Sequence, residues 1–146
     1  MLQKKARIIE FPKVTDSRGN LSFVEGARHV PFSIRRVFYI YDVPGGATRG
    51  GHAHKTCAEV VIAVAGSFDV ILTNGRDEMT VTLNRSNIGV LVPPGTWITM
   101  PNFTTGSVLL ALASEEYEEE DYIRNFDEFM TYVDSLPESE RADVTI

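Results

Sequence analysis

Two histidines that lie two residues apart, His52 and His54, stand in a glycine-rich stretch that runs from Gly46 to Glu59. On an extended strand this spacing points both imidazoles to the same face. One face of that strand therefore carries two groups that titrate near neutral pH. The glycines permit a close approach of a ligand, and Arg49 adds a fixed positive charge that we expect to lower the pKa of the histidines. The stretch predicts a functional site.

These residue types support two kinds of chemistry. A histidine with a pKa near the working pH is suited to general acid/base proton transfer, which contributes on the order of 10²–10⁴ in rate. Alternatively, His52, His54 and Glu59 supply the two nitrogens and one carboxylate of a metal site. A metal and a histidine base compete for the same nitrogen lone pair. The sequence by itself leaves both open.

Composition narrows the class of protein. The chain has 146 residues, of which 43% are hydrophobic and 23% charged, which predicts one domain spanning residues 1–146. A net charge of −6 argues against a nucleic-acid partner. The single cysteine, Cys57, excludes an internal disulfide, and we expect it to be a small buried residue. No apolar stretch has the length of a signal core or a membrane span, so we expect a cytoplasmic protein with no membrane partner.

Short apolar runs separated by glycine and proline predict an all-β sandwich or jelly roll. The helical spacing of apolar residues is confined to the C-terminal end, where it predicts one helix over residues 121–136. The acidic run before it, Glu115–Asp121, is interpreted as a solvated link. The expected strands are Arg7–Phe11, Leu21–Val24, Ser33–Val43, Val60–Val64, a hairpin from Phe68 to Leu83 that turns at Asn74-Gly75, Ile88–Val92, Trp97–Met100 and Val108–Ala113.

The histidine stretch resembles the first conserved motif of the cupins, a superfamily of small β-barrels. Gly46, the His52-Ala53-His54 triplet, Glu59 and Gly66 follow its spacing. In the second cupin motif, Pro93, Gly95 and Asn102 fall into place, and Ile98 stands where a histidine is expected.

Within the cupins, the chain resembles the sugar-nucleotide 3,4-ketoisomerases that act on dTDP-4-keto-6-deoxyhexoses in deoxyamino-sugar biosynthesis. The residues that carry the resemblance are Asp16–Gly19, Ile34–Tyr39, Arg49–Lys55, Gly66-Ser67, Trp97, Leu112–Ser114 and Asp121–Arg124. The resemblance implies a cupin jelly-roll barrel, no cofactor and no metal. It also implies a homodimer that exchanges N-terminal strands within residues 1–30. Three positions depart from the family pattern: Ile98 is usually His or Arg, Phe38 is commonly Tyr, and Glu59 is usually Gln.

Moving a carbonyl group between C4 and C3 requires a base near neutral pKa, which indicates roles for individual residues. We assign His52 as the base that moves a proton between C3 and C4, and His54 as the partner that protonates or orients the sugar oxygens. The sequence leaves open which of the two histidines has which role. The substrate-binding candidates are Arg49, Arg36, Arg18, Trp97, Phe38 and Glu59, with the arginines suited to the diphosphate. Two rivals stay open: a metal-dependent cupin enzyme using His52, His54 and Glu59, and a non-catalytic cupin that binds sugar nucleotides.

Overall fold

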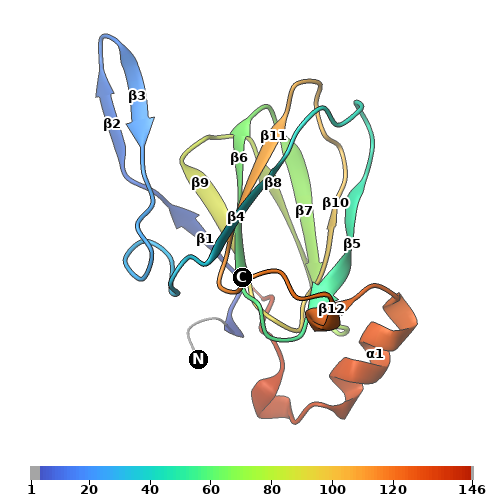
Figure 1. The fold of residues 1–146 in the computed structure, drawn as a ribbon. Helices are drawn as coiled ribbons and strands as arrows, with labels where there is room; N and C mark the ends of the chain where they lie inside the picture. The colour runs from blue at the N-terminus through green and yellow to red at the C-terminus, as the bar shows by residue number, and fades with distance from the viewer. Residues whose placement is uncertain (1–3, 146) are drawn as a thin grey trace.

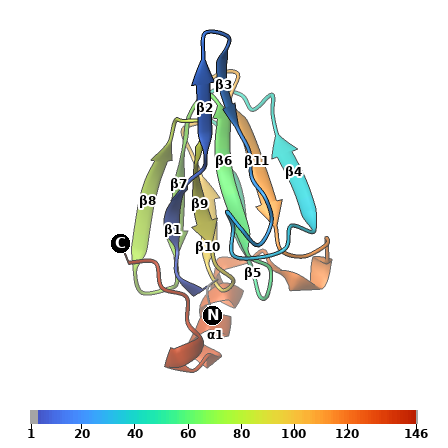
Figure 2. The same ribbon diagram turned by 90° about the vertical axis from the view of Figure 1, so that its left-hand side faces the viewer.

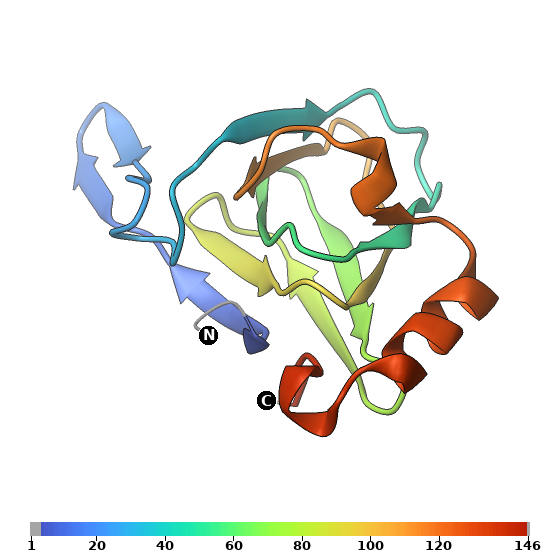
Figure 3. The ribbon, with the colours of Figure 1, turned by 60° about the horizontal axis from the view of Figure 1, so that its bottom comes forward.

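Most of the chain forms short antiparallel strands. The computed structural model describes residues 4–145 (Figure 1). One five-stranded sheet has, in spatial order, β1 (Arg7–Glu10), β9 (Ile88–Val92), β6 (Glu59–Ala65), β11 (Val108–Ala113) and β4 (Arg36–Ile40). The other has β12 (Tyr122–Ile123), β5 (Arg49–His54), β10 (Trp97–Met100), β7 (Phe68–Thr73) and β8 (Glu78–Leu83). The two sheets enclose a barrel, which Figure 3 shows nearly end-on. The prediction of an all-β jelly roll is confirmed.

The main hydrophobic core lies between the two sheets. On β7, the side chains of Phe68, Val70 and Leu72 alternate with half-buried ones, as the period of two in the sequence predicts. The first five residues of β6, Glu59 to Ala63, are buried, and the last two are exposed. Val60 and Ile62 belong to a second hydrophobic cluster on the outer side of the sheet, with Val30 and Phe32 from the segment before β4 and Leu91 from β9.

An N-terminal hairpin extends away from the barrel. It consists of β2 (Lys13–Asp16) and β3 (Gly19–Ser22), and every residue of both strands is exposed (Figures 1 and 2). Ser17 and Arg18 form the turn between the two strands. A two-stranded ribbon in which every residue is exposed has little stability of its own.

The C-terminal segment differs from the predicted helix over 121–136. Residues Glu119–Asp121 form a 3-10 turn, Tyr122–Ile123 form β12, and the helix α1 spans Phe126–Ser135. Tyr and Ile favour strands, and β12 pairs with β5, which offers a free sheet edge. The helix begins after Asn125, whose Oδ1 accepts a hydrogen bond from the backbone N–H of Glu128 at 3.0 Å. Because of this strand and this cap, α1 begins at Phe126 instead of at the predicted position 121. None of the helices formed by residues 4–145 combines the length and hydrophobicity needed to cross a bilayer.

Candidate active site

A β-bulge at Gly51 shapes the strand that carries both histidines. The register of β5 against β10 shifts here: Ile98 is opposite His52, and Thr99 is opposite Gly50. Gly50 has φ +89°, and a Cβ at this position would lie 2.7 Å from the carbonyl oxygen of Ile98. Only glycine fits such a position. Beyond the bulge, the rings of His52 and His54 lie on one side of the strand with centroids 5.4 Å apart, as the spacing predicts.

The histidine strand borders a cavity of about 420 Å³ inside the barrel. Its polar lining comes from Arg49, His52 and Glu59 together with Tyr122 and Arg124. The rest of the lining is Phe38, Ile40, Thr48, Gly50, Val61, Ile98, Met100 and Leu109. A cavity with an apolar wall and a few charged groups is the usual form of a small-molecule site.

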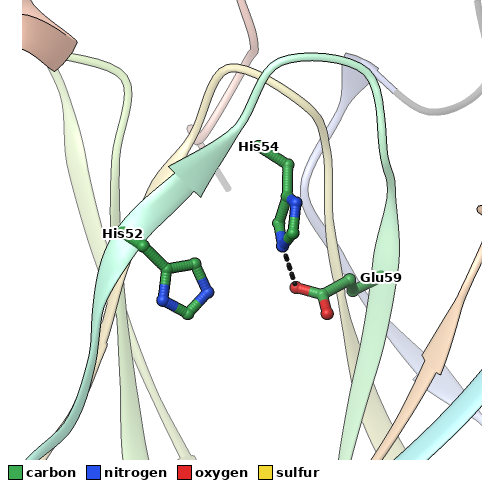
Figure 4. A group of neighbouring side chains, drawn as sticks. All are labelled: His52, His54 and Glu59. Atoms are coloured by element: carbon green, nitrogen blue, oxygen red, sulfur yellow. Dashed lines mark ion pairs between the residues drawn. The ribbon is translucent and has the colours of Figure 1, made fainter. Parts of the chain in front are cut away.

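Behind the cavity, a buried chain of side chains links Asp121, His54 and Glu59. The Nδ1 of His54 lies 3.0 Å from Oδ2 of Asp121, and its Nε2 lies 3.5 Å from Oε1 of Glu59. Figure 4 shows the His54 ring on β5 pointing at the carboxylate of Glu59 on β6. His54 and Glu59 are only 5% and 3% exposed. Glu59 is among the residues that line the cavity, and His54 is not.

The two carboxyl groups of this chain have opposite pKa shifts. Burial raises the pKa of Glu59, although the nearby charges of His54 and Arg36 oppose the shift. Burial also acts on Asp121, but hydrogen bonds from Thr56, His54 and the backbone N–H of Cys57 outweigh it and lower the pKa of Asp121. Asp121 is therefore ionised and accepts hydrogen bonds only, which places the His54 proton on Nδ1.

His52 lies in the cavity wall as a neutral imidazole. Burial, reinforced by the charges of His54 and Arg124, lowers the pKa of His52 to about 4. At neutral pH its ring therefore has a free lone pair and can accept a proton. The sequence attributed this shift to Arg49, whereas the cation that acts on His52 is Arg124.

An aromatic ring, Tyr122, connects the histidines to two arginines. Its centroid lies 4.2 Å from that of His54 and 5.4 Å from that of His52. The Arg124 guanidinium lies over the Tyr122 ring, 4.2 Å from its centroid. The same guanidinium donates two hydrogen bonds to the carboxylate of Glu119. A guanidinium nitrogen of Arg36 donates to the Tyr122 hydroxyl at 3.4 Å. One positive charge thus lies over the face of the ring and another at its hydroxyl.

Four of the predicted site residues line the cavity, namely Phe38, Arg49, His52 and Glu59, and so does Ile98. His54 and Arg36 lie next to the cavity, behind Glu59 and Tyr122 respectively.

Two predicted substrate-binding residues lie elsewhere. Alternation along β10 turns Ile98 inward, and Trp97 outward against Phe126 and Phe129 of α1, with ring centroids 5.3 and 5.6 Å apart. Arg18 is on the exposed hairpin, where it pairs with Asp16 at 2.7 Å. Neither side chain reaches the cavity of its own chain.

Sequence reasoning assigned no site role to Asp121, Tyr122 and Arg124. Tyr122 was assigned to the predicted helix because of the helical spacing of the apolar residues around it. Asp121 was interpreted as the end of a solvated acidic link. A local signal was available, because Asn125 and Glu128 have the spacing of an N-terminal helix cap, which starts the helix after Tyr122-Ile123.

The residues suited to hold a metal are also close together. His52, His54 and Glu59 each offer one ligand atom, and these atoms lie within 4.8 Å of one another. Ile98 faces His52 across the strands and supplies no further ligand. A second group, His54, Cys57 and Asp121, is fully buried, and its Asp121 oxygens already accept hydrogen bonds from Thr56 and Cys57. As expected, Cys57 is buried and free.

An antiparallel barrel with a histidine pair at its internal cavity defines a cupin. Residues 4–134 match the family described as FdtA: WxcM-like, C-terminal, and the chain belongs to this family. It is 42% identical over 127 residues to a TDP-4-oxo-6-deoxy-α-D-glucose-3,4-oxoisomerase from Aneurinibacillus thermoaerophilus, covering 87% of this chain and 91% of that protein.

Solved structures agree with this assignment. QdtA, a sugar 3,4-ketoisomerase from Thermoanaerobacterium thermosaccharolyticum in complex with TDP, is 40% identical with a TM-score of 0.87, covering 92% of this chain and 97% of that one. A His-to-Asn mutant of QdtA in complex with TDP-4-keto-6-deoxyglucose is 39% identical with a TM-score of 0.85, covering 88% and 93%. The predicted family is confirmed.

Proposed function

We propose that this protein is a nucleotide-sugar 3,4-ketoisomerase that moves the keto group of a dTDP-4-keto-6-deoxyhexose from C4 to C3. The observation that carries the proposal is the neutral imidazole of His52 in the wall of a 420 Å³ cavity. Relatives of about 40% identity that bind TDP or TDP-4-keto-6-deoxyglucose support the substrate class. We assign the reaction to the cytoplasm and to deoxyamino-sugar biosynthesis.

His52 acts as the base in this proposal. Its ring takes the proton from C3, the electrons of the C3–H bond form a C3–C4 double bond, and the resulting enediolate is reprotonated at C4. A base that is unprotonated at neutral pH can remove the C3 proton, and positive charge nearby stabilises the enediolate that forms. Arg124 supplies that positive charge beside His52. His54 is a positioning residue, because its ring is held by Asp121 and does not line the cavity.

We assign the substrate-binding roles from the residues that line the cavity. Arg49 and Arg124 line it and have guanidinium groups that match the geometry of a diphosphate. Phe38 and Ile98 contribute apolar wall, where a 6-deoxy methyl group is accommodated. Arg36 holds Tyr122 through its hydroxyl. We propose no metal and no other cofactor.

We further propose that the protein acts as a homodimer of single-domain chains. Val37, Tyr39 and Tyr41 project from the edge strand β4 and the residue just after it, and are 53%, 62% and 60% exposed. The hairpin adds exposed Val14 and Leu21. Exposed apolar residues on an edge strand and a projecting ribbon are suited to pairing with a second copy. Exchange of the N-terminal strands would bring Arg18 toward the cavity of the partner.

Isomerisation in D₂O tests the function and both rivals. The protein is incubated with dTDP-4-keto-6-deoxyglucose, and the sugar protons at C3 and C4 are followed by NMR. We expect a 3-keto product, with deuterium entering the sugar. Binding of the nucleotide sugar with neither exchange nor product would favour the non-catalytic rival. The variant His52→Asn is expected to lose roughly 10²-fold or more in rate, whereas His29→Asn, in a loop outside the cavity, keeps its activity.

A further inference from the structure

We propose that Tyr122 is a catalytic residue whose hydroxyl group carries the proton between the two sugar oxygens. This inference rests on the proposed function and deepens it. It assigns to Tyr122 a part of the reaction that His52 does not perform.

The need for such a group follows from the proton balance. In the substrate, C4 carries a carbonyl oxygen and C3 carries a hydroxyl; in the product, the two are reversed. One proton therefore moves from C3 to C4, and a second moves from O3 to O4. His52 accounts for the first. The sequence indicates a histidine for the second as well, but Asp121 holds the ring of His54, which does not line the cavity.

Tyr122 has the position that the second transfer requires. It is half-buried and lines the cavity. Its register partner on the neighbouring strand β5 is His54, so its ring lies on the side of the sheet that carries both histidines. The ring centroids of Tyr122 and His52 are 5.4 Å apart. The base for the carbon atoms and a hydroxyl for the oxygens thus come from adjacent rings of the cavity wall.

The hydroxyl of Tyr122 has a proton to donate. Its oxygen accepts a hydrogen bond from Nη1 of Arg36 at 3.4 Å. A guanidinium group is a donor only, so the proton of the hydroxyl points away from Arg36. Within residues 4–145, no protein group accepts a hydrogen bond from this hydroxyl. The proton is therefore available to a sugar oxygen bound in the cavity.

Two guanidinium groups stabilise the charge that such a transfer creates. When the hydroxyl gives up its proton, negative charge develops on the oxygen and ring of Tyr122. Arg36 lies at the oxygen, and Arg124 lies over the ring, 4.2 Å from its centroid. Positive charge that is already in place at both points lowers the barrier to the transfer. Arg36 is in this way a positioning residue for the hydroxyl.

The other polar groups of the cavity lining fit this role less well. Phe38 has no hydroxyl, at a position where the family commonly has a tyrosine. Thr48 is exposed in the loop before β5. Glu59 is 3% exposed, and the family usually has Gln at this position. The arginines of the lining do not release their protons at neutral pH. Thr48 and Glu59 are therefore the competitors that an experiment must separate from Tyr122.

The complete cycle balances without an oxidant or reductant. His52 takes the C3 proton, the C3–C4 double bond forms, and O4 takes the proton of the Tyr122 hydroxyl. In the second half, the phenolate takes the O3 proton, the C3=O3 double bond forms, and His52 returns its proton to C4. Both residues end in their starting protonation states.

The test compares two rates in D₂O: initial isomerisation, and exchange of deuterium into C3 of the unreacted substrate. In Tyr122→Phe the enediolate still forms at His52 and returns to substrate, but the transfer between oxygens is impaired. We expect isomerisation to fall by roughly 10²-fold and exchange to fall much less, so that the ratio of exchange to isomerisation rises at least about tenfold. Tyr132→Phe, which removes the hydroxyl of a half-buried tyrosine on α1 outside the cavity, is the matched control and keeps both rates.

Three results would overturn the role of Tyr122: wild-type rates in Tyr122→Phe, a proportional fall of both rates, or a raised ratio in Thr48→Val or Glu59→Gln instead. If Tyr122→Phe does not fold, Arg36→Met is measured, because it removes the donor that orients the hydroxyl, and an unchanged ratio there contradicts the proposal. A wild-type protein that neither exchanges nor isomerises overturns the proposed function, and the role of Tyr122 with it. A loss of both rates in His52→Asn, with the raised ratio in Tyr122→Phe, supports both.

Discussion

The imidazole of His54 donates a hydrogen bond from Nδ1 to Oδ2 of Asp121 at 3.0 Å, although the two residues are 67 positions apart. The same carboxylate accepts a hydrogen bond from the backbone N–H of Thr56 at 2.8 Å. Asp121 therefore joins the C-terminal segment to the turn that follows the histidine strand. One ionised group fixes both the orientation of His54 and the position of β12.

Replacing Asp121 by Asn tests this connection. The amide keeps the size of the side chain but loses the charge that holds the His54 proton on Nδ1. We expect the isomerisation rate to fall by about 10- to 100-fold, comparable with the loss of other groups that orient a histidine. The free energy of unfolding should fall by about 1–3 kcal/mol, because a buried hydrogen-bond acceptor is altered.

The control for this variant is Thr56→Val. It removes the hydroxyl that lies 2.9 Å from Asp121 Oδ1 but keeps the carboxylate and the backbone N–H. Stability should fall while the rate stays within a few-fold of wild type. An equal loss of rate in both variants would show that Asp121 acts through folding alone.

The pH dependence of stability reports the lowered pKa of His52. The folded pKa is about 4 and the ordinary value is 6.5, so the unfolded chain binds more protons between these values. Stability then rises with pH across this window, and it is lost as the pH falls. From pH 7 to pH 4.5 this one group removes roughly 2 kcal/mol from the free energy of unfolding.

Urea unfolding of wild type and His52→Asn at both pH values measures this contribution. We expect the variant to lose about 2 kcal/mol less than wild type on acidification. Glu59 contributes with the opposite sign, because its raised pKa gives stability that is lost as the pH increases. Its contribution is present in both proteins. Equal acid sensitivity of the two proteins would refute the shift at His52.

The histidine strand could be predicted from the sequence because its signal is local. Two residues of spacing on a strand place His52 and His54 on one face whatever the rest of the chain does. The same holds for Ile98, whose position on β10 follows from alternation. The turn residues and apolar runs likewise predicted most strands of the barrel, but β12 was assigned to a helix.

The parts that could not be predicted depend on long-range pairing. Tyr122 and Ile123 have apolar side chains at helical spacing, and only the free edge of β5 makes them a strand. The contact of Asp121 with His54 follows from that pairing. Similarly, the position of Trp97 against Phe126 and Phe129 requires knowing where α1 packs. Local patterns do not contain these contacts.

Trp97 should act through packing rather than through substrate. Its ring lies against Phe126 and Phe129, outside the cavity. We expect Trp97→Ala to lower the free energy of unfolding by roughly 3 kcal/mol and to leave KM for the nucleotide sugar within about twofold. Phe126→Ala, on the other side of the same cluster, should show the same pattern to a smaller extent. A tenfold rise of KM in the Trp97 variant would place its ring in the binding site.

The proposed homodimer is tested by the oligomeric state of a surface variant. Tyr39 and Tyr41 stack with centroids 5.9 Å apart on the exposed side of the edge strand. Light scattering at micromolar concentration should give twice the chain mass for wild type. Tyr39→Glu combined with Tyr41→Glu should give the monomer, because two like charges would be buried at the interface. A monomeric wild type would contradict the proposal.

The last prediction concerns metal. His52, His54 and Glu59 are close enough to bind a divalent ion, so their geometry is compatible with a metal site as well as with proton transfer. Three observations argue for proton transfer instead. Ile98 replaces a further ligand with an aliphatic side chain opposite His52. The Arg124 charge, which adds to the effect of burial in lowering the pKa of His52, also repels a divalent cation. A coordinated His52 would lose the lone pair that the base requires. We therefore expect activity to survive prolonged EDTA treatment followed by gel filtration, and elemental analysis to find well under one metal ion per chain. Loss of turnover on chelation, restored by one particular divalent ion and by no other, would refute this prediction and favour the metal-dependent reading of the three residues.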